Sequence, residues 1–298
     1  MNTHRATGAH RRTARLRNSK VARGVLSLLT AASVGLGITV AAQPATAAPN
    51  GNVVVIGDSY AANPDQYYNT FRNVDGFVPD NYPRQSGCLQ APNSWPRQLS
   101  KRHGVPVNDW SCSGLTSKRA ISRVDAAHRA GDIHAGTRTV VLNYGMNNHG
   151  PNGTDNGADI LNPGDVRNRF LADTRAAVNK VRAYAPNAKI VFAGQMSITS
   201  NGMFCFLNVV PNLPAGLPVP VLSDVERWVR SMQAEAATRN NINFVDLKAE
   251  TANRGTCAPD NQRFISGIID TTTPHYNMMI HPNLKGSNWV ADRMSRSL

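Results

Sequence analysis

Charged residues are scarce in this chain of 298 residues: Asp, Glu, Lys and Arg make up 17%, and aromatic residues make up 6%. Hydrophobic residues reach 41%, so the composition is neither that of a disordered chain nor that of a coiled coil. Seven of the 32 basic residues lie within the first 47, which leaves 25 against 19 acidic residues, or about +6, for the rest. No cluster of basic and aromatic residues follows Ala48. We therefore expect no nucleic-acid partner.

Several motifs that would indicate a cofactor are missing. The sequence has no His-Glu-x-x-His, no EF-hand loop and no Cys/His cluster, so it predicts neither a metal site nor another cofactor. It has no P-loop of the form Gly-x-x-x-x-Gly-Lys-Ser/Thr, which argues against a nucleotide site. A Gly-x-Ser-x-Gly elbow is also missing, which argues against the α/β-hydrolase fold.

The first 47 residues have the pattern of a signal peptide. Basic residues without any acid precede an apolar stretch over residues 25–42, and Ala45 and Ala47 form a small-x-small cleavage site. We expect cleavage after Ala47, a secreted protein, and a single domain over residues 48–298. The alternative is an uncleaved membrane anchor, because the apolar stretch approaches a spanning length. No later segment does so, and we expect no stable membrane span after cleavage.

Only four cysteines are present, and they are Cys88, Cys112, Cys205 and Cys257. An even number in an exported protein indicates two disulfides, for which three pairings exist. We favour Cys88–Cys112 and Cys205–Cys257, because each closes a separate local loop. Free buried thiols are the alternative, whereas the spacings are too wide for a zinc site of paired Cys-x-x-Cys motifs.

Short apolar runs rich in β-branched residues predict strands that are buried on both faces of a sheet. They cover residues 52–57, 105–110, 139–145, 189–194 and 241–246. Helical patterns separate some of these runs: one over residues 166–181 after Asp165 as a cap, one after Ser223 or Asp224, and one from near Pro282. Strands that alternate with helices predict an α/β fold with a parallel sheet.

The stretch over residues 202–221 does not fit this alternation, because it is apolar and contains four prolines that forbid a long helix. Two interpretations stay open. The stretch lines an acyl pocket or forms a lid, or it is a loop that packs on the core and is held by Cys205.

Four residues follow predicted strands or open a predicted helix, and side chains and amides of these types can together cleave an acyl bond. Ser59 ends a Gly-Asp-Ser motif after the first strand, where a helix start exposes its hydroxyl and leaves its amide free to donate. Gly114 follows the second strand, and its amide can approach a ligand closely. Asn147 follows the third strand with an amide that can stabilise an oxyanion. His281 opens the last helix and can accept the serine proton.

In this order, Ser59, Gly114, Asn147 and His281 resemble the four sequence blocks of the SGNH (GDSL-type) hydrolases, over about residues 51–298. The resemblance implies a three-layer α/β/α sandwich with a flavodoxin-like parallel sheet. It implies a carboxylic ester hydrolase without a cofactor, in which Ser59 is the nucleophile and His281 the base. The amides of Ser59 and Gly114 and the side chain of Asn147 would form the oxyanion hole.

The sequence departs from this family pattern at two positions. Asn148 stands where the family usually has Asp. The resemblance assigns the oxyanion role to the neighbouring Asn147, so we expect this change to have little effect on catalysis. The last block lacks its acid, because Met278 occupies the position three residues before His281. An acid there orients the imidazole. We expect a backbone carbonyl, that of Met278 or one close to it, to take this role, with Asp270 as a distant second choice.

Three functions remain open. The first is a lipase or short-chain carboxylesterase, which the apolar stretch over residues 202–221 favours. The second is a polysaccharide O-deacetylase, and the third is a catalytically silent protein that binds the cell envelope, for which the missing acid is the only support. We expect a monomer that acts on a small-molecule, lipid or cell-envelope ester. Cys88 and Cys112 resemble the first disulfide of extracellular actinobacterial members of the family.

Overall fold

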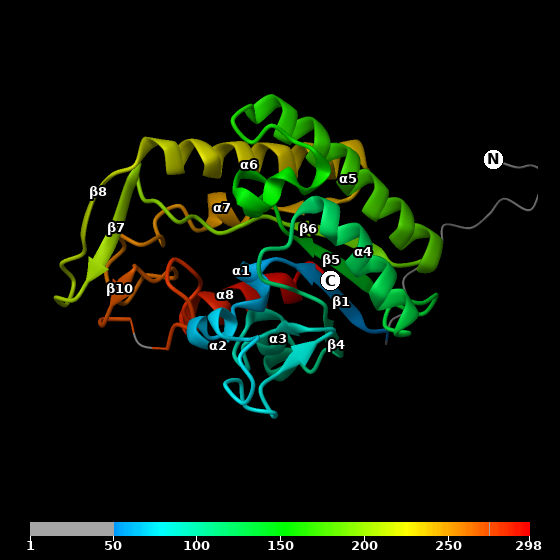
Figure 1. The fold of residues 1–298 in the computed structure, drawn as a ribbon, viewed down its shortest axis with the longest axis horizontal. Coiled ribbons are helices and arrows are strands. Elements are labelled where there is room, and N and C mark those ends of the chain that lie inside the picture. Colours follow the sequence, from blue (N-terminus) through cyan, green and yellow to red (C-terminus); the bar gives the residue numbers. More distant parts are fainter. Residues whose placement is uncertain (1–50, 274) are drawn as a thin grey trace, which may run out of the picture. The chain divides into compact units, whose positions relative to one another are not determined.

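The structure is a computed structural model that describes residues 51–273 and 275–298 (Figure 1). The predicted signal peptide, residues 1–47, lies outside the described residues. Within the described part of the chain, no helix combines the length and the apolar character that crossing a bilayer requires.

The core is a five-stranded sheet in the order β4–β1–β5–β6–β9, in which every neighbouring pair is parallel. In chain order the strands are β1 (Val53–Gly57), β4 (Val107–Asp109), β5 (Thr139–Asn143), β6 (Lys189–Ala193) and β9 (Asn243–Val245). This 2-1-3-4-5 arrangement is the flavodoxin-like order. It confirms the predicted fold class, and each predicted strand forms within its expected range.

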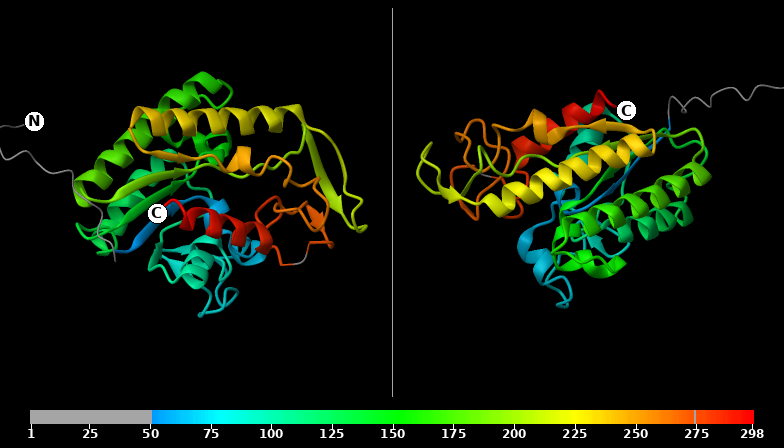
Figure 2. Two further views of the ribbon diagram at one scale, coloured as in Figure 1. Left: turned by 180° about the vertical axis from the view of Figure 1, so that it is seen from behind. Right: turned by 90° about the horizontal axis from the view of Figure 1, so that it is seen from above.

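Strand residues alternate between two cores because successive side chains point to opposite faces of a sheet. Val54 and Ile56 of β1 pack into one core, whereas Val53 and Val55 pack into the other. The first core is covered by α4 (Ser117–Arg129), α5 (Pro163–Tyr184) and α6 (Pro220–Arg239). The second is covered by α1 (Ser59–Ala62), α3 (Trp95–His103), α7 (Leu247–Glu250) and α8 (Leu284–Ser295). The resulting three layers are visible in Figures 1 and 2.

The apolar stretch over residues 202–221 forms a hairpin and the first turn of α6. Strands β7 (Met203–Asn208) and β8 (Ala215–Pro218) pair antiparallel, and β10 (Ile269–Asp270) lies on the other side of β7. Figure 2 shows that this hairpin extends beyond the end of α6, away from the central sheet. The remaining short elements are α2 (Gln66–Thr70), β2 (Arg84–Gln85), β3 (Cys88–Leu89), η1 (Met146–His149) and η2 (Pro151–Asn156).

Two predicted helix starts need correction. The cap of α5 is Asn162, whose side chain accepts hydrogen bonds from the amides of Gly164 and Asp165, so the predicted cap Asp165 lies inside the first turn. Helix α6 begins at Pro220, earlier than predicted, because proline fits the first turn of a helix, where its missing N–H is not needed. Helices α3 and α4 were not predicted from the sequence.

Both favoured cysteine pairs are bonded in the structure. Cys88–Cys112 joins β3 to the loop after β4, with 5.1 Å between the Cα atoms. Cys205–Cys257 joins β7 to the segment before β10, with 4.9 Å between the Cα atoms. The first disulfide therefore fixes the loop that leads to Gly114, and the second fixes the hairpin.

Candidate active site

Ser59 is the first residue of α1, at the carboxyl end of β1, which lies between β4 and β5 in the sheet. Gly57 allows the helix to turn back over the strand, because a Cβ at this position would lie 2.4 Å from the Cβ of Ala61. Asp58 caps the helix by accepting a hydrogen bond of 2.9 Å from the amide of Tyr60. No described residue accepts a hydrogen bond from the amide of Ser59, so this N–H is free to donate to a ligand.

Asp58 is a fully buried carboxyl beside the candidate nucleophile. Burial raises its pKa to about 7, although hydrogen bonds from the amides of Tyr60 and Gly145 and from the side chain of Gln195 oppose the shift. These donors occupy the carboxyl oxygens. The sequence motif contained Asp58 without indicating this role, which is to hold the turn that presents Ser59.

The imidazole of His281 makes two hydrogen bonds. Its Nε2 lies 2.8 Å from Oγ of Ser59, and its Nδ1 lies 2.8 Å from the carbonyl oxygen of Met279. Because a carbonyl only accepts hydrogen bonds, Nδ1 carries the proton and Nε2 is left to accept from the serine hydroxyl. The sequence prediction is corrected here by one residue: the carbonyl of Met278 instead accepts from Oγ of Ser266 at 2.9 Å.

Ile280 explains why the Met279 carbonyl reaches the ring. Its φ of 61° places a β-branched residue in the left-handed region, where such residues are rare. The turn brings the carbonyl of Met279 toward the imidazole two residues later. The amide of Ile280 donates to the carbonyl of Ser266 at 3.2 Å, and the carbonyl of Ile280 accepts from the Tyr60 hydroxyl at 2.8 Å. Surrounding contacts therefore hold a conformation that the residue alone disfavours.

Burial lowers the pKa of His281 to about 4, because it disfavours the charged ring, and the hydrogen bond to the Met279 carbonyl offsets only part of this effect. The ring of Tyr60 packs against the imidazole with 4.8 Å between the ring centroids. At neutral pH the ring is therefore uncharged and can take up a proton.

Asp270, the other candidate for orienting His281, belongs to a different network. Its carboxylate contacts the buried guanidinium of Arg263 at 3.2 Å and accepts hydrogen bonds from the amides of Gly267 and Thr273. Burial alone would raise its pKa, but the hydrogen bonds from Thr273 and Gly267 and the charge of Arg263 hold it below the usual value. None of its hydrogen bonds goes to His281.

Gly114 and Asn147 lie in the loops that follow the neighbours of β1 in the sheet. The amide of Cys112 donates to the carbonyl of Gly57 at 2.9 Å, which places the Gly114 loop beside the start of α1. Gly114 has a φ of 77°, and a Cβ there would lie 2.9 Å from Nδ2 of Asn152, so both its conformation and its surroundings favour glycine. Its amide has no acceptor among the described residues.

The Asn147 side chain contacts the same loop. Its Nδ2 donates to the carbonyl of Leu115 at 3.1 Å, which leaves its second N–H for a ligand. The neighbouring Asn148 is buried and holds the start of α4: it accepts from the amide of Ser117 at 3.1 Å and donates to its hydroxyl at 2.8 Å. An asparagine suits this position because its side chain has an oxygen that accepts one of these hydrogen bonds and an N–H that donates the other.

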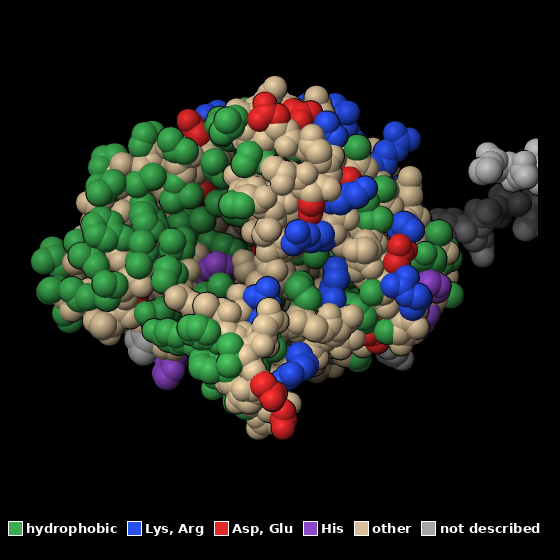
Figure 3. All heavy atoms as spheres, in the orientation of Figure 1, with side chains coloured by type: hydrophobic (Ala, Val, Ile, Leu, Met, Phe, Trp, Pro, Cys, Tyr) green, Lys and Arg blue, Asp and Glu red, His purple; other side chains and the backbone are tan. Residues whose placement is uncertain are grey.

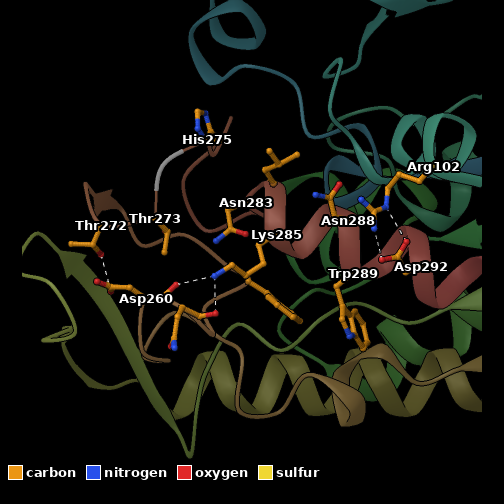
Figure 4. A pocket seen from close by; sticks show the side chains of 13 residues that line it. Arg102, Asp260, Thr272, Thr273, His275, Asn283, Lys285, Asn288, Trp289 and Asp292 are labelled. Atoms are coloured by element: carbon orange, nitrogen blue, oxygen red, sulfur yellow. Dashed lines mark hydrogen bonds and ion pairs between the residues drawn. The ribbon is translucent and has the colours of Figure 1, made fainter.

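A hollow beside α8 is separate from these groups. It has a volume of about 710 Å³, and its lining includes Arg102, Lys285, Trp289 and Asp292 but neither Ser59 nor His281 (Figure 4). Arg102 and Asp292 form an ion pair at 2.7 Å, and Lys285 donates to the carbonyl of Asn261 at 2.7 Å. Its charged groups are thus engaged with the protein. Over residues 51–273 and 275–298, no cluster of His, Cys, Asp and Glu is suited to a metal ion.

A family model gives this geometry its context. Residues 55–289 match the GDSL-like lipase/acylhydrolase family. The chain belongs to this family and is a hydrolase of the lipase and esterase type.

Two relatives agree with this assignment, and two solved structures share the fold. Lipase 2 of Streptomyces coelicolor is 26% identical, with 88% of this chain and 93% of that protein covered. An esterase of Streptomyces scabiei is also 26% identical, with 92% and 96% covered. The crystal structure of a phospholipase A1 from Streptomyces albidoflavus has a TM-score of 0.54 at 16% identity, with 84% of this chain and 100% of that chain covered. An extracellular lipase structure from Streptomyces rimosus gives 0.54 at 16% identity, with 83% and 100% covered. At such identities the structural likeness shows the fold.

We expect the imidazole of His281 to titrate with a midpoint near pH 4, because burial lowers its pKa to about 4. Above this pH the ring should be neutral with the proton on Nδ1, and below it the ring should be an imidazolium. Nitrogen-15 NMR of the histidine rings measures both properties, and the His281→Gln variant identifies the signals. A midpoint near the ordinary value of 6.5, or a neutral ring with its proton on Nε2, contradicts this description.

We expect Asp270→Asn to lower the free energy of unfolding by about 3 kcal/mol, because it leaves part of the buried Arg263 charge uncompensated. Asp224→Asn is the matched control, since its ion pair with Arg227 is exposed and should contribute less than about 1 kcal/mol. Urea unfolding measures both. If Asp270→Asn left stability unchanged and instead shifted the His281 titration, Asp270 would belong to the active site after all.

Proposed function

We propose that the protein hydrolyses carboxylic esters through an acyl-enzyme formed on Ser59. The observation that carries this proposal is the contact of 2.8 Å between Oγ of Ser59 and Nε2 of His281, with Nδ1 held at 2.8 Å from a carbonyl. A hydroxyl that donates to a neutral imidazole is the arrangement that makes serine a nucleophile. Membership of a lipase/acylhydrolase family supports an ester as the substrate.

In the first half of the reaction, Oγ of Ser59 attacks the ester carbonyl carbon while its proton passes to Nε2 of His281. The negative charge that develops on the carbonyl oxygen is stabilised by the amides of Ser59 and Gly114 and by Nδ2 of Asn147. The imidazolium then gives its proton to the alcohol oxygen as the carbon–oxygen bond breaks. The alcohol leaves, and the acyl group stays on Ser59.

In the second half, His281 takes a proton from a water molecule, whose oxygen attacks the acyl carbon. The imidazolium returns the proton to Oγ of Ser59, and the carboxylic acid leaves. The carbonyl of Met279 holds the ring throughout and accepts from its Nδ1–H. As a neutral dipole it stabilises the imidazolium less than a carboxylate would. The ring is consequently a stronger acid toward the leaving group and a weaker base toward Ser59.

The surface of the protein favours a lipid or another apolar ester over a polysaccharide ester. Exposed apolar side chains lie on the β7–β8 hairpin and on the segment that includes α2, among them Leu213, Leu217, Phe71 and Phe77. Apolar patches of this kind bind apolar ligands better than hydrated sugars. O-deacetylation of a polysaccharide remains the alternative reaction at the same site.

We further propose that the protein acts outside the cell as a monomer. The basic and apolar pattern of its first 47 residues supports export. The disulfides Cys88–Cys112 and Cys205–Cys257 support an oxidising environment, because such bonds persist outside the cytosol. The cell envelope is the place where such a protein would first meet lipid.

We expect the wild type to hydrolyse nitrophenyl esters and Ser59→Ala to lose this activity by several orders of magnitude, since the nucleophile is gone. A panel with acyl chains of about two to sixteen carbons, measured by release of nitrophenol, also defines the substrate class. Highest turnover at about eight carbons or more supports a lipase, and a strict preference for acetate supports deacetylation. Equal turnover by wild type and variant removes Ser59 from the mechanism, and no turnover by either supports a silent homologue.

We expect Asn147→Ala to lower kcat by about 100- to 1000-fold with a small change in KM, because its amide donates to an oxyanion that exists only near the transition state. Steady-state kinetics on one nitrophenyl ester measures the two constants. Asn179→Ala is the control, since Asn179 is exposed on α5. A change in KM with kcat preserved would assign Asn147 to substrate binding instead.

A further inference from the structure

Apolar side chains are exposed on the β7–β8 hairpin and beside it. We call this set the hairpin surface, and its members are Val209, Val210, Leu213, Leu217, Val221, Ile268 and Ile269. Figure 3 shows hydrophobic side chains gathered over β7, β8 and β10, and a second group over α2 on the same face. An apolar surface that several segments share marks an interaction site more often than scattered single residues do.

The hairpin surface contains no charge of its own. Residues 194–223 include no Asp, Glu, Lys, Arg or His. Two acids lie beside it, and both pair with Arg263. Asp260 accepts from the amide of Asn212 at 2.9 Å and contacts Arg263 at 2.6 Å. Asp270, which follows Ile269, is buried and contacts Arg263 at 3.2 Å. Protein interfaces usually have a polar rim that gives orientation and specificity. A surface without charge instead matches hydrocarbon, into which no ion has to be transferred.

The shape of the hairpin also favours a lipid partner. All four residues of β8 are exposed, although alternate side chains point to opposite faces of the strand. A protein partner would cover one face, whereas a lipid layer surrounds an inserted hairpin on both. Pro214 and Pro218 lack the N–H groups with which another strand could pair along the free edge of β8. This argues against a second copy that docks by strand addition.

Hydrogen bonds connect the hairpin surface to the candidate catalytic histidine. The amide of Ile268 donates to the carbonyl of Phe206 in β7 at 2.9 Å. The amide of Ile280 donates to the carbonyl of Gly267 at 3.3 Å, and Ile280 directly precedes His281. A surface that engages Ile268 therefore lies within one short loop of the residue that contacts Ser59.

We propose that the hairpin surface inserts into the surface of a lipid aggregate and thereby brings the Ser59 site to esters in that aggregate. The docking step stands on the exposed apolar residues and needs no catalysis. Delivery of the ester to Ser59 rests on the proposed function.

The test is flotation with phosphatidylcholine vesicles, with the full mature protein and three variants. Leu213→Glu places a charge on a side chain that is 66% exposed, and Val221→Glu does so in the first turn of α6, where an acid suits the helix. Leu161→Glu is the matched control, because Leu161 is 89% exposed but lies outside the hairpin surface. We expect each hairpin variant to lower partitioning by about 10-fold or more, and the control to bind like the wild type.

Because the hairpin surface is uncharged, raising the salt concentration to about 0.5 M should leave vesicle binding unchanged. Wild-type protein that stays in the unbound fraction overturns the proposal, and so does equal loss in the Leu161→Glu control. Sedimentation of a wild-type dimer that Leu213→Glu dissociates, without vesicle binding, assigns the surface to a second copy and also overturns it.

Hydrolysis of a soluble acetate ester separates this proposal from the proposed function. Hairpin variants should retain this activity and lose hydrolysis of esters presented in vesicles. If wild type and Ser59→Ala hydrolyse the soluble ester equally, the proposed function fails, and flotation still decides whether the surface docks on lipid. If the hairpin variants lose soluble and vesicle activity in equal proportion, the hairpin supports the site and does not dock.

Discussion

The hydrogen bond between the backbone carbonyl of Met279 and the ring of His281 is the contact on which the candidate site depends. It selects the tautomer in which Nε2 faces the hydroxyl of Ser59 at 2.8 Å. Without a fixed acceptor at Nδ1, the ring could turn or carry its proton on the wrong nitrogen. The left-handed conformation of Ile280, held through the Tyr60 hydroxyl, makes this contact available. Nucleophile and base are therefore linked through the same short helix, since Tyr60 follows Ser59.

The parallel sheet explains how residues far apart in sequence meet. The loops after β4, β1 and β5 leave the same edge of the sheet, as expected for parallel strands. Gly114, Ser59 and Asn147 occupy these three loops. His281 arrives from the other end of the chain, before α8, which packs on α3 and on the face of the sheet that α1 covers. The hairpin and Ile268 and Ile269 at β10 then add apolar surface.

The sequence was sufficient to predict the sheet because its strands are buried on both faces and read as continuous β-branched runs. Helices α3 and α4 were missed because their buried faces include polar and small residues, among them Gln98, Ala120 and Arg123, and contain few large apolar ones. Ser59, Gly114 and Asn147 were predicted from motifs that follow strands, and His281 was predicted from a motif that opens the last helix. The acceptor for His281 was placed one residue away, because no side-chain pattern reports a left-handed isoleucine. The free edge and two-sided exposure of β8 depend on tertiary pairing, which the proline-rich stretch alone does not define.

The use of a main-chain acceptor has a consequence for how this site tolerates change. Every amino acid has a carbonyl, so replacing the side chain at position 279 leaves the oxygen that holds the imidazole in place. Alanine scanning detects an orienting aspartate, but it does not detect a main-chain carbonyl that has the same role. The vulnerable position is the next one, where proline would fix φ near −65° and turn the peptide away. This arrangement therefore constrains the backbone conformation at Ile280 more than the identity of the side chain at Met279.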